Sequence, residues 1–311
     1  MRADRLGAYG YERDISPNID ALAADSLLIE RFYSPLPLTA PAHAALFTGR
    51  DPWQTGVRYN GIPLSDDEET LAEILRAHGI HTAAFVSGWT LKRVVAELAQ
   101  GFEVYDDSFD AIERRAGETT DRALSWLRDN GDTRFFLWVH YFDPHYIYDP
   151  PAPHRGRWLR EGPPEVKEPS LYDGEIAYVD AQLGRLLATL DRLGLSESTF
   201  VALTADHGES LGEHGYAFDH GDLLFEHQVR IPFLLRGPGV PPGRRAHPTG
   251  RSIDVLPTLL ALLGIDPPSE LEGRSLLATD SLASDLFFES NQCDREGQTK
   301  TGCWPLGGEG K

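Results

Sequence analysis

Three histidine-bearing segments offer residues that could hold a metal ion. Each lies beside a short apolar run: FFLWVHYFDPH at 135–145, FVALTADHGESLGEHG at 200–215 and YAFDHGDLLFEH at 216–227. Asp206 and His207 are adjacent, and a hard carboxylate oxygen beside an imidazole suits a divalent ion such as Zn²⁺ or Mn²⁺. The alternative is a capping Asp206 next to a surface His207. The two His-Gly pairs that follow within fifteen residues, at His214 and His220, favour a metal site.

A hydroxyl at a predicted helix entrance offers a nucleophile. In SPLPLTAPAHAALFTGR, residues 34–50, Thr39, Pro41 and His43 alternate where the proline-broken segment turns into a helix. A neutral threonine is a poor nucleophile, but a bound divalent ion lowers the pKa of its hydroxyl. Helix-entry N–H groups and the His43 imidazole could then face one anion. For Thr39 taken alone, a helix N-cap remains the competing interpretation.

Other acidic and imidazole groups are weaker candidates. Asp173 and Asp180 share one face of a predicted helix and could approach a second metal, but such carboxylates more often face solvent or cap a loop. They are therefore left out of the predicted site. A loop hydrogen bond explains His214 equally well.

The elements that must position these residues alternate between strands and helices. Ser16-Pro17 predicts a helix start, and DDEETLAEILRAHGI predicts an amphipathic helix that ends at Gly79. Apolar runs predict buried strands within 81–87, 135–142, 198–208 and 230–237, and an apolar helical repeat spans 172–190. We therefore expect an α/β fold with a largely parallel central sheet and helices on both faces. The Pro-rich residues 146–170 are expected to form a long surface loop.

Bulk properties exclude some functions. The 311 residues carry a net charge of −19, which argues against nucleic-acid binding. No apolar run reaches the length of a membrane span. The two cysteines, Cys293 and Cys303, leave no cysteine metal site in the core, and their pairing stays open. No signal peptide is evident, and the sequence favours no compartment and no oligomeric state. We expect a catalytic domain over residues 1–279 and an irregular tail over 280–311.

Taken together, the segments resemble the sulfatase family of the alkaline-phosphatase superfamily. The matching stretches are RADRLGAYGYERDISPNIDALAADSLLIERFYS, LTAPAHAALFTGRDPWQTGV, FVALTADHGESLGEHG and SIDVLPTLLALLGIDPPSELEGRSLL, which lie within residues 1–277. The resemblance implies one α/β sandwich domain and a metal-bound nucleophile. It also implies attack on a phosphate, phosphonate or sulfate ester and an enzyme-linked intermediate that water later hydrolyses.

Departures from the family pattern indicate which of these reactions to expect. Sulfatases carry a cysteine or serine that is oxidised to formylglycine, whereas Thr39 could give only a ketone. His43 replaces the arginine of that pattern, FVSGWTLKR replaces a lysine- and histidine-bearing segment, and His220 replaces a lysine. An unmodified threonine resembles the phosphodiesterase and phosphonate monoester hydrolase branches of the superfamily.

The residue patterns and the family resemblance together predict one site. Asp206 and His207 hold a divalent ion (Mn, Zn or Ca) together with Thr39. His43, His145 and His220 bind a small anionic ester or protonate its leaving group, and His140 is a further candidate. The competing functions are a sulfatase that uses unmodified Thr39 and an inactive binding module.

The resemblance also predicts that one strand and one metal ligand of the family are missing. In the family, an apolar strand with an aspartate ligand precedes the RADRLGAYG motif, and that aspartate would fall just before Met1. Asp4 matches a different family aspartate. We therefore expect the sheet to lack one central strand and the metal to lack one ligand, which would impair activity.

Overall fold

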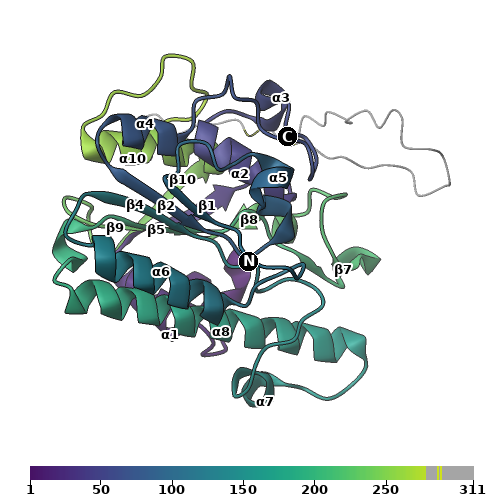
Figure 1. The fold of residues 1–311 in the computed structure, drawn as a ribbon. Coiled ribbons are helices and arrows are strands. Elements are labelled where there is room, and N and C mark those ends of the chain that lie inside the picture. The colour runs from purple at the N-terminus through teal and green to yellow at the C-terminus, as the bar shows by residue number, and fades with distance from the viewer. Residues whose placement is uncertain (278–285, 287, 289–311) are drawn as a thin grey trace.

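The computed structural model describes residues 1–277, 286 and 288, so the rest of the predicted tail and both cysteines lie outside the described residues. Strands form the middle of the molecule and helices cover both faces (Figure 1). One face carries α1, α6 and α8, and the other carries α2, α4 and α10. This arrangement confirms the predicted α/β class. None of the described helices is long and apolar enough to span a membrane.

The larger sheet has the order β10-β1-β9-β5, with β8 also paired to β1. Strands β1 and β10 are parallel, whereas β9 runs antiparallel to both β1 and β5. Strands β1, β5 and β10 therefore run in the same direction. The bounds are β1 (Leu27–Tyr33), β5 (Val201–Thr204), β8 (Arg230–Ile231), β9 (Phe233–Arg236) and β10 (Arg244–Arg251).

The second sheet has the order β3-β2-β4 and is entirely parallel. A small antiparallel pair, β6 and β7, follows β5. The bounds are β2 (His81–Phe85), β3 (Val104–Asp106), β4 (Phe135–Val139), β6 (Ser210–Leu211) and β7 (Ala217–Asp219).

Helices connect these strands, as the alternating sequence pattern predicts. The α-helices are α1 (Pro17–Ala24), α2 (Thr39–Thr48), α3 (Pro52–Thr55), α4 (Leu71–Ala77), α5 (Arg93–Ala96), α6 (Ala116–Asn130), α7 (His154–Trp158), α8 (Pro164–Arg192), α9 (Glu226–Val229) and α10 (Val255–Leu263). Short 3₁₀ turns are η1 (Ala3–Arg5), η2 (Gly7–Tyr9), η3 (Trp89–Leu91), η4 (Ser196–Ser198), η5 (Glu213–Gly215) and η6 (Ser252–Asp254).

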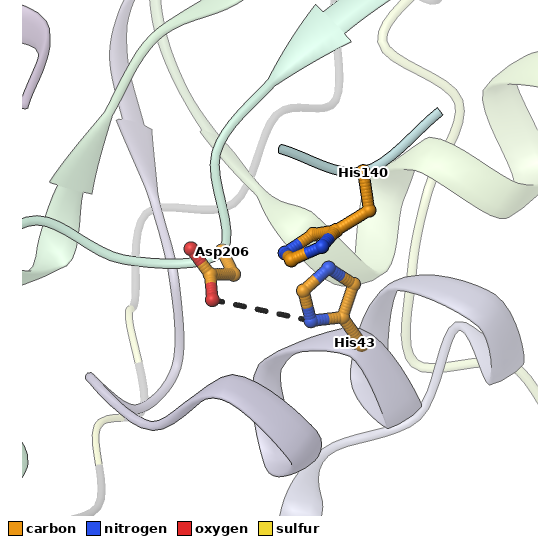
Figure 2. Close-up of side chains that lie close together, drawn as sticks. All are labelled: His43, His140 and Asp206. Atoms are coloured by element: carbon orange, nitrogen blue, oxygen red, sulfur yellow. Dashed lines mark ion pairs between the residues drawn. The ribbon is translucent and has the colours of Figure 1, made fainter. Parts of the chain in front are cut away.

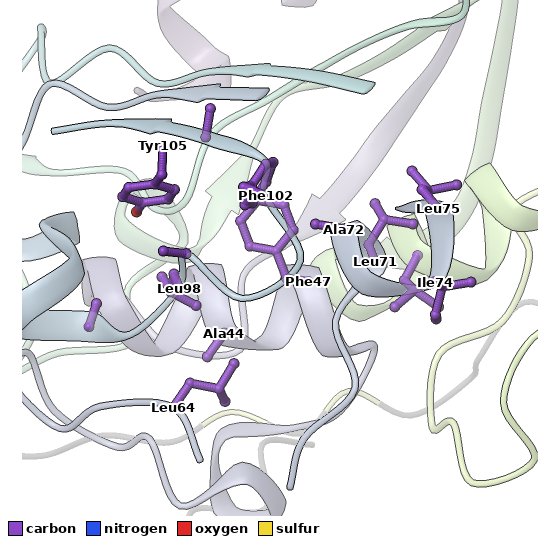
Figure 3. Close-up of a cluster of buried hydrophobic side chains, with 14 of the residues drawn as sticks. Ala44, Phe47, Leu64, Leu71, Ala72, Ile74, Leu75, Leu98, Phe102 and Tyr105 are labelled. Carbon is purple, nitrogen blue, oxygen red and sulfur yellow. The ribbon is translucent and has the colours of Figure 1, made fainter. Parts of the chain in front are cut away.

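A core cluster fixes α2 against the second sheet (Figure 3). Phe47 of α2 meets the Phe102 ring edge-on, with centroids 5.9 Å apart, and both rings are buried. Burying each phenylalanine stabilises the fold by about 2–3 kcal/mol. Helix α2 begins with Thr39, so this packing also holds the predicted nucleophile in place.

The expectation of a long loop over residues 146–170 is wrong in part. Helix α7 lies inside this range, and α8 already begins at Pro164. Proline suits the first turn of a helix, because its missing N–H has no partner there and its fixed φ is helical. Pro169 lies within the second turn of α8. The proline content therefore marks a helix start as well as a loop.

A cavity of about 730 Å³ separates β4 from β5. Among the described strands, β4 pairs only with β2, and β5 pairs only with β9. Apolar side chains of α2, α6, α8 and α10 line the cavity above and below, and Met1 lies in its wall. The carboxyl ends of β4 and β5 lead to residues that lie close together, His140 and Asp206, so the two strands run in the same direction. A further parallel strand at this place stays a prediction.

The cavity permits a direct test of that prediction. We expect an added segment of about six apolar, β-branched residues, joined ahead of Met1, to raise the melting temperature by roughly 5 °C or more. The reason is that it would pair two strand edges and fill an apolar space; a gain of 1 kcal/mol raises Tm by about 2–4 °C in a domain of 150–250 residues. Calorimetry measures the shift. A Gly-Ser extension of equal length is the control, and equal melting temperatures for the two extensions would contradict the prediction.

Candidate active site

Three side chains that could hold a metal ion meet at the carboxyl ends of β4 and β5. His43 of α2, His140 after β4 and Asp206 after β5 point toward one another (Figure 2), and one donor atom from each lies within 4.8 Å of the others. Asp206 Oδ2 lies 4.0 Å from His43 Nδ1. Parallel strands bring residues far apart in the chain to one edge of a sheet, and ligand sites in α/β folds collect there.

Thr39 is the first residue of α2, and its hydroxyl does not cap the helix. The N-cap residue is Leu38, whose apolar side chain makes no capping bond. Thr39 Oγ1 instead lies 3.4 Å from His207 Nε2, in a buried position. The alternative interpretation of Thr39 as a plain N-cap is therefore wrong.

The groups around Thr39 fit a cation. His207 Nδ1 donates to the carbonyl of Gly208 at 2.7 Å, which leaves a lone pair on Nε2. That Nε2 lies 3.3 Å from Asp206 Oδ2. Two ligands of a tetrahedral ion with bonds of about 2.0–2.1 Å lie roughly 3.3–3.4 Å apart. The spacings of His207 Nε2 to Asp206 Oδ2 and to Thr39 Oγ1 both match this value, as the predicted ligand set requires.

His145 and His220 form a facing pair of imidazoles. Their Nε2 atoms are 3.2 Å apart, and their Nδ1 atoms donate to the carbonyls of Tyr146 at 2.6 Å and Pro37 at 3.0 Å. Both Nε2 atoms therefore carry lone pairs, which repel each other unless a proton lies between them. The His220 ring also lies 4.1 Å, between centroids, from the ring of His207. The pair is thus adjacent to the predicted metal ligands.

Burial governs the charge of the imidazoles. It lowers the pKa of His43, that of His140 to about 3, that of His207 to about 3 and that of His145 to about 4. Asp206 is partly buried, which by itself opposes ionisation, but the imidazoles of His207 and His43 lower the pKa of its carboxyl. At neutral pH the imidazoles of these four residues are uncharged, which is the form that binds metal. An anion beside His145 would favour its protonated form.

All six predicted site residues thus converge. The chain of contacts runs from His145 to His220, His207 and Thr39, and from His207 to Asp206 and His43. The structure also brings His140 to Asp206, and it places His43 with these two residues rather than beside the His145–His220 pair. The sequence signal for His140 is its position directly after an apolar strand. The roles of these residues stay predictions.

Residues left out of the predicted site have structural partners. Asp173 pairs with Arg5 and Arg13, while Asp180 accepts hydrogen bonds from the backbone of Ile19 and Asn18 at the start of α1. Asp180 thus caps a neighbouring segment, as the alternative interpretation expects, whereas Asp173 is buried in ion pairs and neither faces solvent nor caps a loop. Elsewhere, Asp4 is paired with Arg2, and the His214 ring stacks on Phe225 at 4.0 Å.

The α/β fold thus brings histidines and an aspartate together at the carboxyl ends of its strands, where proteins of this class bind their ligands. The family model called Sulfatase matches residues 1–265. The chain belongs to the sulfatase family.

Relatives of known name are similar along most of this chain. The ulvan-active sulfatase of Formosa agariphila is 26% identical over 318 residues, which cover 88% of this chain and 62% of that protein. The human N-acetylgalactosamine-6-sulfatase is 27% identical over 331 residues, with the same coverage of 88% and 62%. The chain thus spans about three fifths of the length of these curated relatives.

Solved structures share the fold. The phosphonate monoester hydrolase of Agrobacterium radiobacter superposes with a TM-score of 0.81 at 22% identity, covering 95% of this chain and 79% of that chain. A phosphonate monoester hydrolase from Silicibacter pomeroyi has a TM-score of 0.77 at 23% identity, covering 94% and 78%. At this identity the likeness concerns the fold.

Proposed function

We propose that the protein is a metal-dependent hydrolase that cleaves a phosphate diester, phosphonate or phosphate ester through an intermediate on Thr39. The observation that carries the proposal is the position of the Thr39 hydroxyl. It is buried beside the lone pair of His207 Nε2, which also lies 3.3 Å from Asp206 Oδ2, and it is not used to cap its helix. The catalytic unit is proposed to span residues 1–279, and the substrate is a small anionic ester.

Each group of site residues is assigned one part of the proposed reaction. A divalent ion (Mn, Zn or Ca), when bound by Asp206, His207 and Thr39, supplies positive charge that acidifies the hydroxyl. The acidified hydroxyl loses its proton to solvent, and Thr39 Oγ1 then attacks phosphorus, so an O–P bond forms while the bond to the leaving oxygen breaks. A proton held between His145 and His220 once the anionic ester is bound passes to the leaving oxygen. Water then attacks the phosphorus and releases Thr39, with the histidine pair taking back a proton.

The choice of phosphorus over sulfur rests on Thr39 itself. Threonine carries a methyl group on Cβ, so oxidation cannot produce the aldehyde that formylglycine chemistry uses. Phosphoryl transfer depends chiefly on charge neutralisation and positioning, which an ion and histidines provide. The names of the curated relatives favour a second candidate, a sulfuric ester hydrolase that uses unmodified Thr39.

Rates with matched phosphorus and sulfate esters distinguish these two candidate functions. We expect the metal-loaded protein to hydrolyse a nitrophenyl phosphodiester or phosphonate monoester at least about tenfold faster, in kcat/KM, than nitrophenyl sulfate, because the charge that the site neutralises suits phosphoryl transfer. Release of nitrophenolate measures both reactions under one set of conditions. A preference for the sulfate would favour the second candidate. Metal binding without turnover of either ester would indicate a binding module.

A further inference from the structure

The segment 143–149, which carries His145, is anchored on one buried carboxyl group of α8. Glu175 is 3% exposed. Its Oε2 accepts a hydrogen bond from the backbone N–H of His145 at 3.2 Å, and its Oε1 accepts one from that of Asp149 at 2.7 Å. A single side chain therefore ties together two backbone positions on either side of Tyr146.

Further contacts hold the same segment against the site. Tyr148 donates its hydroxyl hydrogen to Glu209 Oε2 at 2.5 Å. Asp143 Oδ2 accepts a hydrogen bond from the backbone of Ala116 at 3.0 Å. The His145 ring stacks on Phe142, with centroids 4.2 Å apart. Of these contacts, only the one from Glu175 reaches the backbone of His145 itself.

Burying the carboxyl group of Glu175 is energetically unfavourable if it serves packing alone. Burial, and then the nearby Asp143 carboxyl, raise the pKa of Glu175 to about 9. Its hydrogen-bond partners within the described residues are backbone N–H groups rather than a basic side chain. A buried carboxyl group with acidic neighbours lowers stability, and such costs concentrate near functional sites.

We propose that Glu175 is a positioning residue: it fixes segment 143–149 and thereby holds His145 Nε2 opposite His220 for proton delivery to the leaving group. The inference rests on the proposed ester hydrolysis. Glu175 acts through the backbone of His145 and does not touch the substrate.

The proposal predicts a dependence on the leaving group. As the bond from phosphorus to the leaving oxygen breaks, the proton moves from an imidazole Nε2 to that oxygen. An alkoxide needs this proton far more than a nitrophenolate does. Displacing His145 should therefore slow alkyl esters more than nitrophenyl esters, whereas general loss of structure slows both equally.

The test uses Glu175→Gln and Glu175→Ala, with Asp180→Asn as a matched control. Asp180 is also a buried carboxyl group of α8 that accepts backbone N–H bonds, but its partners start α1. We expect the Glu175 variants to lose at least about tenfold more kcat/KM for an alkyl ester than for a nitrophenyl ester. Glutamine, which keeps one acceptor, should lose less than alanine. The control should change both esters by the same factor.

A second measurement does not depend on turnover. The ring of Phe142 shifts the imidazole proton signals of His145 in an NMR spectrum. We expect these signals to move in Glu175→Gln and to stay in place in Asp180→Asn. Unmoved His145 signals, or equal losses for both esters, would overturn the proposal. If the unaltered protein hydrolyses no ester, the proposed function fails, and the NMR comparison still decides whether Glu175 positions His145.

Discussion

Replacing Thr39 with alanine is expected to lower ester turnover by at least about 10³-fold, because no other group in the contact chain of the site is a hydroxyl nucleophile. The fold should persist, since Thr39 makes no capping bond and α2 is held by the Phe47 cluster. Thr39→Ser keeps the hydroxyl and should restore a substantial part of the rate. Initial rates with a nitrophenyl phosphodiester measure each variant.

Thr48→Ala provides a matched control for this variant. Thr48 lies in the same helix and is equally buried, but its hydroxyl donates to the carbonyl of Ala44 at 2.7 Å. We expect Thr48→Ala to reduce stability slightly and to leave turnover nearly unchanged. Mass spectrometry of acid-quenched protein should locate a phosphoryl or phosphonyl group on Thr39. Undiminished turnover in Thr39→Ala would show that the nucleophile is another group.

Removing Asp206 or His207 is expected to remove the metal. Because an ion has few protein ligands, Asp206→Ala and His207→Ala should each weaken binding of Mn²⁺ or Zn²⁺ by at least about 100-fold. Elemental analysis after dialysis measures occupancy, and activity should fall with it. Circular dichroism should show that the secondary structure remains.

His214→Ala is the control for nonspecific loss of an imidazole. Its ring stacks on Phe225, outside the metal-binding group. The variant should keep full metal occupancy. If Asp206→Ala loses metal while His207→Ala keeps it, the ligands are those of the His43, His140 and Asp206 group. Full occupancy in both variants would refute the ligand assignment.

Much of the fold follows from local sequence patterns. The strand near His140 and the strand before Asp206 were predictable because continuous apolar runs of this length suit buried strands. The start of α1 at Pro17 follows from the geometry of proline, which needs no distant partner. The placement of Asp206-His207 after a strand likewise predicts a site at the edge of a sheet, since chain order alone puts these residues there.

The arrangement inside the site depended on tertiary contacts. Which nitrogen of His145, His207 or His220 carries its lone pair is decided by a backbone carbonyl beside the ring, and for His220 that carbonyl belongs to Pro37, 183 residues away. Whether Thr39 caps α2 or faces His207 depends on where β5 ends relative to α2. Glu175 could not be distinguished from other acids of α8, because its partners lie in a segment that only packing brings beneath the site. Local propensity sets backbone conformation over a few residues, whereas these contacts join residues whose proximity exists only in the folded chain.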